Sequence, residues 1–290
     1  MDKKGNWDRG KDISLLETYD IVTGERKLLK EFDCLIEAPN WSRDGKYLVY
    51  NSGGKIFRYW LETGAVEQVE TGFAINCNND HLLSFDGKQL AVSHSEEKMA
   101  SRIYLLPIEG GTPKEVTPNA PSYLHGWSPD GNSLAYCAFR KGKRGDIYTV
   151  SACGGEEVRL TFGEGHSDGP EYSPNGKDIW FNSTRSGLMQ LWRMKTDGSE
   201  QTQMTFDEDL NSWFPHLSPD GKQVVFLSYH KEDLKPEEHL PHKNVLLRLM
   251  PASGGIPRTL LSLFGGQGTI NVNSWSPDGG KFAFVSYRRP

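Results

Sequence analysis

Trp127-Ser128-Pro129-Asp130-Gly131 is one of six related pentapeptides in a chain of 290 residues. The acidic or Asn positions of the six copies are 44, 86, 130, 175, 220 and 278, so consecutive copies lie 42, 44, 45, 45 and 58 residues apart. A repeat of about 40 residues is typical of an array of supersecondary units. The remaining copies are Trp41-Ser-Arg-Asp-Gly45, Leu83-Ser-Phe-Asp-Gly87, Tyr172-Ser-Pro-Asn-Gly176, Leu217-Ser-Pro-Asp-Gly221 and Trp275-Ser-Pro-Asp-Gly279.

The pentapeptide has the residue types of a tight turn. Pro129 presets φ near about −65°, Asp130 favours a turn, and Gly131 supplies the left-handed conformation that closes a hairpin loop. An apolar or alternating run follows each copy, as in Tyr47-Leu-Val-Tyr50 and Asp178-Ile-Trp-Phe181. Such runs are typical of strands. The pentapeptide therefore predicts the first hairpin of each unit.

The two ends of the chain carry complementary halves of the repeat. Residues 13–32 resemble the second half of later units, and residues 271–287 resemble the first half. Joining the halves in one sheet removes two exposed strand edges, which otherwise favour aggregation. We therefore predict an all-β fold, a six-bladed β-propeller with four antiparallel strands per blade. The N-terminal strands complete the C-terminal blade.

Residues 1–290 are predicted to form a single propeller domain, with a loose N-terminus over residues 1–12. Residues 230–243 form a charged insertion in blade five that contains His230, His239 and His242. Its composition favours a solvated loop, and a lid over a site is the functional alternative. Histidines in such a segment indicate a metal site only weakly.

The composition excludes several classes of function. A net charge of −5 without a basic stripe argues against nucleic acid as a partner. No apolar run is long enough to span a membrane. Residues 1–12 lack the apolar core of a secretory signal, which predicts a cytoplasmic protein, or a periplasmic one if the chain is a trimmed mature form. Spacing predicts free thiols, without zinc binding, for Cys34, Cys77, Cys137 and Cys153.

Polar residues precede each predicted hairpin, where the first strand of a blade lines the central channel. Equivalent positions of a closed ring face one axis, so these side chains become neighbours. Hydrogen-bonding groups beside aromatic faces suit a saccharide or another polar ligand. The same groups can be structural instead, bound to water or backbone amides. The predicted ligand-binding residues are Glu37, Asn79, His81, Tyr123, His125, Asp168, Trp213, His216, Gln267 and Asn271.

The repeat is similar to the propeller repeat of the TolB-like family. It combines Trp-Ser-Pro-Asp-Gly-Lys, an apolar run, an Ile-Tyr strand, a Gly-containing turn and a closing Leu-Thr, over about residues 13–287. The resemblance implies a propeller but no particular activity. Related propellers accompany the hydrolase domain of prolyl oligopeptidase-like peptidases and form the oligogalacturonate lyases. TolB itself binds a lipoprotein partner, so the resemblance also implies a protein-interaction platform.

Two classes of function stay open beside that platform. One is a binding module for a polar small molecule or saccharide, acting as a monomer without a cofactor. The other is a metal-dependent carbohydrate-active enzyme resembling oligogalacturonate lyase, which holds a divalent metal with His and Gln side chains. The comparable residues here are His81, His125, His216 and Gln267, although Gly-Thr-Ile-Asn follows Gln267 in place of the clustered histidines of the lyases. The Gly-x-Ser-x-Gly pattern of serine hydrolases occurs once, as Gly165-His166-Ser167-Asp168-Gly169. The sequence has no helix-rich segment that could hold it on the strand-to-helix turn of a nucleophile elbow, which argues against a peptidase.

Overall fold

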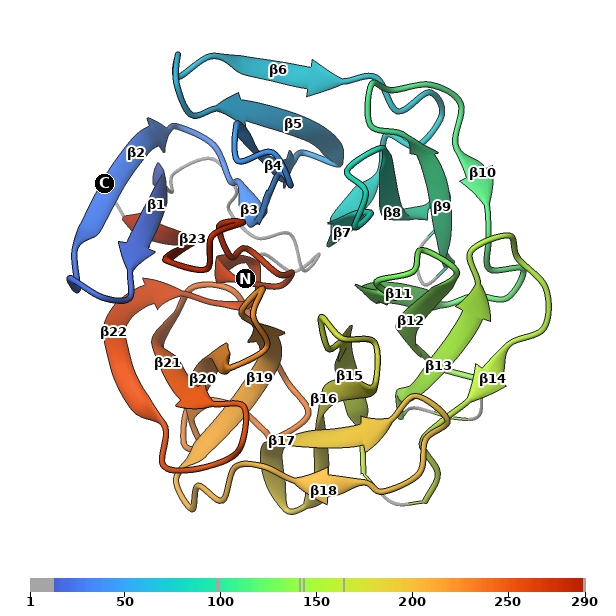
Figure 1. Cartoon of the computed structure of the whole chain (residues 1–290), viewed down its shortest axis with the longest axis vertical. Coiled ribbons are helices and arrows are strands. Elements are labelled where there is room, and N and C mark those ends of the chain that lie inside the picture. The colour runs from blue at the N-terminus through green and yellow to red at the C-terminus, as the bar shows by residue number, and fades with distance from the viewer. Residues whose placement is uncertain (1–12, 98–99, 141, 143, 164, 289–290) are drawn as a thin grey trace, which may run out of the picture.

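A computed structural model describes residues 13–97, 100–140, 142, 144–163 and 165–288. Six antiparallel sheets surround a central axis (Figure 1). This arrangement confirms the predicted all-β, six-bladed propeller. The expected loose N-terminus, residues 1–12, lies outside the described residues. Among the described residues, no helix has the length and apolar character needed to cross a membrane.

Blades one to three follow one another along the chain, and the first strand of each lies nearest the axis (Figure 1). Blade one contains β3 (Glu37–Trp41), β4 (Tyr47–Ser52), β5 (Lys55–Trp60) and β6 (Val66–Val69). Blade two contains β7 (Cys77–Leu83), β8 (Gln89–Ser95), β9 (Ser101–Pro107) and β10 (Lys114–Glu115). Blade three contains β11 (Ser122–Trp127), β12 (Ser133–Ala138), β13 (Asp146–Ser151) and β14 (Val158–Arg159).

Blades four and five have the same order, and blade six joins the two ends of the chain. Blade four contains β15 (Ser167–Tyr172), β16 (Asp178–Ser186), β17 (Leu188–Lys195) and β18 (Thr202–Gln203). Blade five contains β19 (Leu210–Leu217), β20 (Gln223–His230), β21 (Lys243–Pro251) and β22 (Arg258–Gly265). Blade six contains β23 (Lys281–Arg288), β1 (Ile13–Asp20) and β2 (Arg26–Phe32), and the 3-10 helix η1 (Gln267–Thr269) precedes it.

The repeated pentapeptide forms the turn between the first two strands, and its Ser and Asp stabilise that turn. In blade three, Ser128 Oγ donates to Asp130 Oδ1 at 2.5 Å, and the N–H of Asn132 donates to the same oxygen at 3.0 Å. These hydrogen bonds lower the pKa of Asp130. Gly131 has a φ of 78°, which glycine adopts without strain. The recurrence of Ser, Asp and Gly therefore has a local physical cause.

Blade six closes the ring by antiparallel pairing of β1 with β23 over eight residue pairs. Glu17 of β1 is buried and accepts a hydrogen bond from Ser286 Oγ of β23 at 2.6 Å. Arg26 of β2 donates its Nε–H to the same carboxylate at 2.6 Å. One buried carboxylate therefore links all three strands of the closing sheet.

Blade six differs from the expected closing blade in one detail, because its innermost strand is reduced to an isolated bridge. A single bridge, Trp275 to Phe282, stands where the other blades have a full first strand. The chain before it forms η1 and sends the side chains of Asn271 and Asn273 across the channel. Asn271 Nδ2 donates to Asp80 Oδ1 at 2.7 Å, and Asn273 Nδ2 donates to Glu171 Oε1 at 2.8 Å. Side-chain hydrogen bonds thus replace part of the strand pairing.

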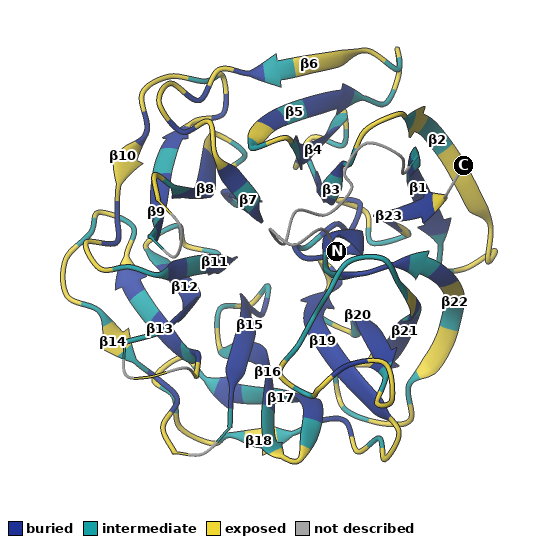
Figure 2. Ribbon diagram, turned by 180° about the vertical axis from the view of Figure 1, so that it is seen from behind, coloured by how far each residue is buried: buried dark blue, intermediate teal, exposed yellow. Residues whose placement is uncertain are grey.

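The cores lie between neighbouring blades. Trp180 of blade four, for example, shares an apolar cluster with Phe226 of blade five. Exposed residues concentrate on the outermost strands, whereas the inner and middle strands are buried (Figure 2). Each blade therefore depends on both neighbours for burial of its faces.

Deletion of residues 1–32 tests the closure. The deletion removes β1, β2 and the Glu17 contacts and leaves the edge of β23 unpaired, so we expect aggregation or failure to fold. Size-exclusion chromatography and chemical denaturation measure the outcome. A monomeric truncated protein that unfolds cooperatively near the midpoint of the parent would contradict this role of the closing blade.

Candidate functional site

A cavity of about 760 Å³ lies on the central axis, at the end where the inner strands begin. Blades two to five and the segment around η1 supply its walls. Many of the lining side chains carry a charge or an amide group. The lining residues are Asn78, Asn79, Asp80, Tyr123, His125, Phe139, Arg144, Gly165, His166, Asp168, Thr184, Arg185, Glu237, His239, Gln267 and Asn271.

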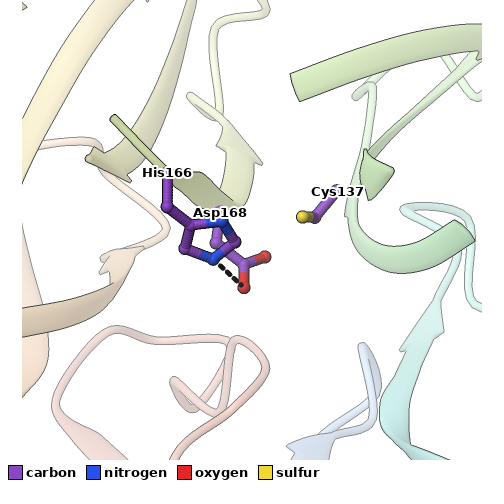
Figure 3. Close-up of side chains that lie close together, drawn as sticks. All are labelled: Cys137, His166 and Asp168. Carbon is purple, nitrogen blue, oxygen red and sulfur yellow. Dashed lines mark ion pairs between the residues drawn. The ribbon is translucent and has the colours of Figure 1, made fainter. Parts of the chain in front are cut away.

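Three imidazoles converge on the carboxylate of Asp168 in β15. Asp168 Oδ1 lies 3.3 Å from His125 Nε2. Asp168 Oδ2 lies 3.5 Å from His166 Nε2 and 3.7 Å from His239 Nε2. The dashed line in Figure 3 marks the contact with His166. Asp168 and His125 are each only 6% exposed, so this contact is largely removed from water.

Charge stabilises the ionised forms of His125 and Asp168. Burial raises the pKa of Asp168, but hydrogen bonds from His125 and His166 outweigh burial and hold that pKa well below its ordinary value. Burial lowers the pKa of His125, but the carboxylates of Asp80 and Asp168 outweigh burial and raise it. The two groups therefore form a buried ion pair that faces the cavity.

Asp80 of β7 is the second buried carboxylate beside His125, and its Oδ1 lies 3.7 Å from His125 Nε2. Asn271 Nδ2 donates to Asp80 Oδ1 at 2.7 Å, and Asn78 Nδ2 donates to Asp80 Oδ2 at 2.5 Å. Burial raises the pKa of Asp80, and the charge of His125 opposes that change. Blades two, three and four thus contribute one member each to a chain of charges, Asp80, His125 and Asp168.

The insertion of blade five reaches the cavity. Its Glu237 and His239 line the wall. His239 Nδ1 lies 2.7 Å from Gln267 Oε1, and because an amide oxygen only accepts, Nδ1 carries a proton. The ring of His239 also stacks on Trp213 of β19, with 4.5 Å between ring centroids. These contacts agree with the lid alternative and differ from the solvated loop that the composition favoured.

Cys137, His166 and Asp168 lie close enough together to resemble a metal site or a catalytic triad (Figure 3). The N–H of Gly145 donates to His166 Nδ1 at 2.8 Å, so the proton of the neutral ring resides on Nε2, which faces Asp168. The thiol of Cys137 donates to the carbonyl of Ser167 at 3.4 Å, and burial raises its pKa well above the ordinary value. Because the Nδ1 of His166 already accepts a hydrogen bond, the neutral ring has no free lone pair on Nε2 for a metal ion. The raised pKa of the Cys137 thiol does not fit an activated nucleophile.

Six of the ten predicted ligand-binding residues line the cavity: Asn79, Tyr123, His125, Asp168, Gln267 and Asn271. The other four lie outside its lining. Glu37 lies behind the wall, where its Oε1 is 3.5 Å from Asn79 Nδ2. Trp213 packs against the ring of His239, and His81 is fully buried.

His216 also lies outside the lining and has a structural partner on each ring nitrogen. Its Nδ1 lies 2.7 Å from Glu171 Oε2, and its Nε2 lies 2.7 Å from the carbonyl of Ile270. Of the four residues compared with the lyase metal ligands, His125 and Gln267 line the cavity, whereas His81 and His216 do not.

Irregular pairing in β7 displaces its residues from the equivalent positions of the other blades. The first strand of each of blades one to five has a register shift, but the shift in β7, between Cys77 and His81, inserts two residues where the others insert one. Such bulges redirect side chains locally. Sequence counting consequently selected His81 and omitted its neighbour Asp80, which lines the cavity. His239 was omitted because its position depends on how the insertion folds back over the ring.

Comparison with known proteins assigns the chain to a family. Residues 83–247 match the TolB beta propeller domain, so the chain belongs to the TolB β-propeller family. A Tol-Pal system protein TolB of Francisella tularensis is 30% identical over 69% of this chain and 47% of its own length. The chain thus spans about half the length of that TolB relative.

Two relatives from Agrobacterium are more similar. An uncharacterized protein of Agrobacterium fabrum is 49% identical over 94% of this chain and 92% of its own length. A solved structure provisionally assigned as TolB, from Agrobacterium tumefaciens, has a TM-score of 0.91 and 48% identity, and covers 97% of this chain and 100% of its own. An oligogalacturonate lyase in complex with manganese has a TM-score of 0.57 and 17% identity over 97% of this chain and 85% of its own, which shows a shared fold alone.

The buried imidazole of His81 gives a test by pH. Burial lowers the pKa of His81 to about 4, from about 6.5 in an unfolded chain. Folding therefore favours the neutral ring, so this contribution is complete above about pH 6.5 and is lost as the pH falls. Between pH 7 and 4, we expect the wild type to lose about 3 kcal/mol more unfolding free energy than His81→Asn.

Chemical denaturation in steps across this pH range measures the difference. Only the slopes are compared, because the substitution also changes packing at every pH. Parallel stability curves for the two proteins would show that His81 is not desolvated in the folded state.

Proposed function

We propose that the chain is a binding module that takes a polar small molecule, with a saccharide as the first candidate, in the cavity at the channel mouth. The observation that carries the proposal is the buried chain of charges Asp80, His125 and Asp168 along its wall. Propeller packing does not require these charges, because the blades pack through separate apolar clusters.

The energetic cost of burying these groups supports a functional role. Removing charged groups from water costs several kcal/mol per ion, and a buried ion pair often adds little net stability. Groups with strongly shifted pKa values that face a cavity are candidates for functional sites. Here hydrogen bonds from His125 and His166 lower the pKa of Asp168, and the carboxylates of Asp80 and Asp168 raise the pKa of His125. The imidazole of His125 and the carboxylate of Asp168 can therefore donate hydrogen bonds to a ligand and accept them from it.

The size and lining of the cavity favour a compact polar ligand over a broad surface contact. Its volume of about 760 Å³ is within the range of about 300–1,000 Å³ for small-molecule sites. Tyr123 and Phe139 contact each other edge to face at 6.1 Å and supply an aromatic wall. Amides of Asn79, Asn271 and Gln267 can donate to hydroxyl groups and accept from them. An aromatic wall beside such amides suits a sugar ring.

Asp168→Asn tests the proposal with little change of shape. The substitution removes the charge that orders His125 and His166, so we expect affinity for the ligand to fall about ten- to a hundred-fold, the loss of about 1.5–3 kcal/mol. Isothermal titration calorimetry against neutral and acidic oligosaccharides measures the change. Circular dichroism and the melting temperature report any loss of folding.

Asp207→Asn is the matched control. It breaks a second ion pair, in which Arg248 Nη1 lies 2.7 Å from Asp207 Oδ2, away from the cavity. A comparable loss of stability without loss of affinity is expected. Failure of every oligosaccharide to bind the wild type, or equal affinity for the wild type and Asp168→Asn, would contradict the proposal. Binding of a protein partner that competes for the same mouth would favour the interaction platform instead.

A further inference from the structure

Two adjacent copies of the repeated pentapeptide depart from the others at one position. The residue after Ser is Pro129, Pro174, Pro219 or Pro277 in four copies, but it is Arg43 in blade one and Phe85 in blade two. All six residues lie in the hairpin turns that surround the second mouth of the channel, opposite the candidate site. The departure therefore changes the surface of this mouth on one side only.

The prolines contact the turn of the next blade. A Cβ placed on Gly176 would meet Pro129 Cδ at 3.7 Å, and one on Gly221 would meet Pro174 Cδ at 3.9 Å. Arg43 keeps this contact with its aliphatic stem, since a Cβ on Gly87 would meet Arg43 Cβ at 3.5 Å. Its guanidinium extends further and lies over the ring of Phe85, with Cζ 4.4 Å from the centroid. The two substituted positions thus form a pair.

This pair lines a second cavity of about 260 Å³. Trp127, Tyr172 and Pro174 add apolar walls. A cavity of about 150 Å³ is large enough for benzene, so the space suits a group of one ring and a short chain. His125 borders both this cavity and the candidate site. The channel therefore contains two cavities, one at each mouth, and His125 lies between them.

The guanidinium of Arg43 is available to a ligand. Within the described part of the chain it forms no hydrogen bond and no ion pair, in contrast to Arg140, which lies 2.5 Å from Glu157. Glu171 also lines the cavity, but its oxygens are occupied. They accept from the N–H of Leu217 and from Asn273 Nδ2, both at 2.8 Å, and one lies 2.7 Å from His216 Nδ1. Arg43 thus presents its donors beside an apolar wall.

We infer that this second cavity is a binding site for an organic carboxylate with an aromatic or apolar body. The planar fork of Arg43 matches the two oxygens of a carboxylate, and the rings of Phe85, Trp127 and Tyr172 cover the body of the ligand. The carboxylate belongs either to a free acid or to the C-terminus of a peptide, since both present the same group. The site is distinct from the one proposed above and does not depend on its function.

Arg43→Pro is the decisive variant, because it restores the residue found in four other copies. Among the described residues, the N–H of Arg43 has no hydrogen-bond partner, so the turn loses none. The probes are 3-phenylpropionate and its amide, and a tripeptide ending in phenylalanine with a free or an amidated C-terminus. We expect each free carboxylate to bind the wild type at least about ten-fold more tightly than its amide, and Arg43→Pro to abolish the difference.

Ligand-observed NMR and calorimetry measure affinity, and the melting temperature confirms folding. Lys46→Ala removes one positive charge from the same turn without touching the cavity, and it should keep the preference for the carboxylate. Phe85→Pro should weaken acid and amide alike. Preference for the free acid or for the peptide identifies the source of the carboxylate. Equal binding of acid and amide, an undiminished preference in Arg43→Pro, or no binding of any probe would overturn the inference.

Discussion

The pairing of β1 with β23 is the contact on which the geometry of the channel depends. An open array of the same blades would not bring its first and last inner segments together. Closure places Asn271 opposite blade two, where its Nδ2 donates to Asp80 Oδ1 across 191 positions of sequence. The buried carboxylate of Glu17 fixes the closing sheet by accepting from Arg26 and Ser286. The convergence of side chains at the axis therefore follows from one strand pairing at the edge of blade six.

The apolar clusters and the buried charged groups occupy different layers of the blades. The inter-blade clusters consist of apolar side chains such as Trp180 and Phe226. The innermost strands carry Asp80, His125 and Asp168, whose side chains are buried in contact with one another. Because the apolar layer already closes the ring, the inner layer can carry desolvated charges that contribute little to folding.

The sequence was sufficient to predict the propeller, its six blades and its closing blade, because turns and strands follow local rules of residue type and period. Six of the ten candidate residues also line the cavity, since equivalent repeats face one axis. The failures have a physical origin. A bulge in β7 directs Asp80 inward and buries His81 outside the lining, and such a register shift has no clear sequence signal. His239 reaches the cavity through tertiary contacts with Trp213 and Gln267.

Departures from the repeat shape both ends of the channel. At one mouth the insertion of blade five brings His239 over Asp168, and at the other Arg43 and Phe85 replace the usual prolines. In a regular repeat, all sides of each mouth would be equivalent. Since His125 borders both cavities, a charge bound at either end acts on the same imidazole. The two cavities therefore share His125 as a common lining residue.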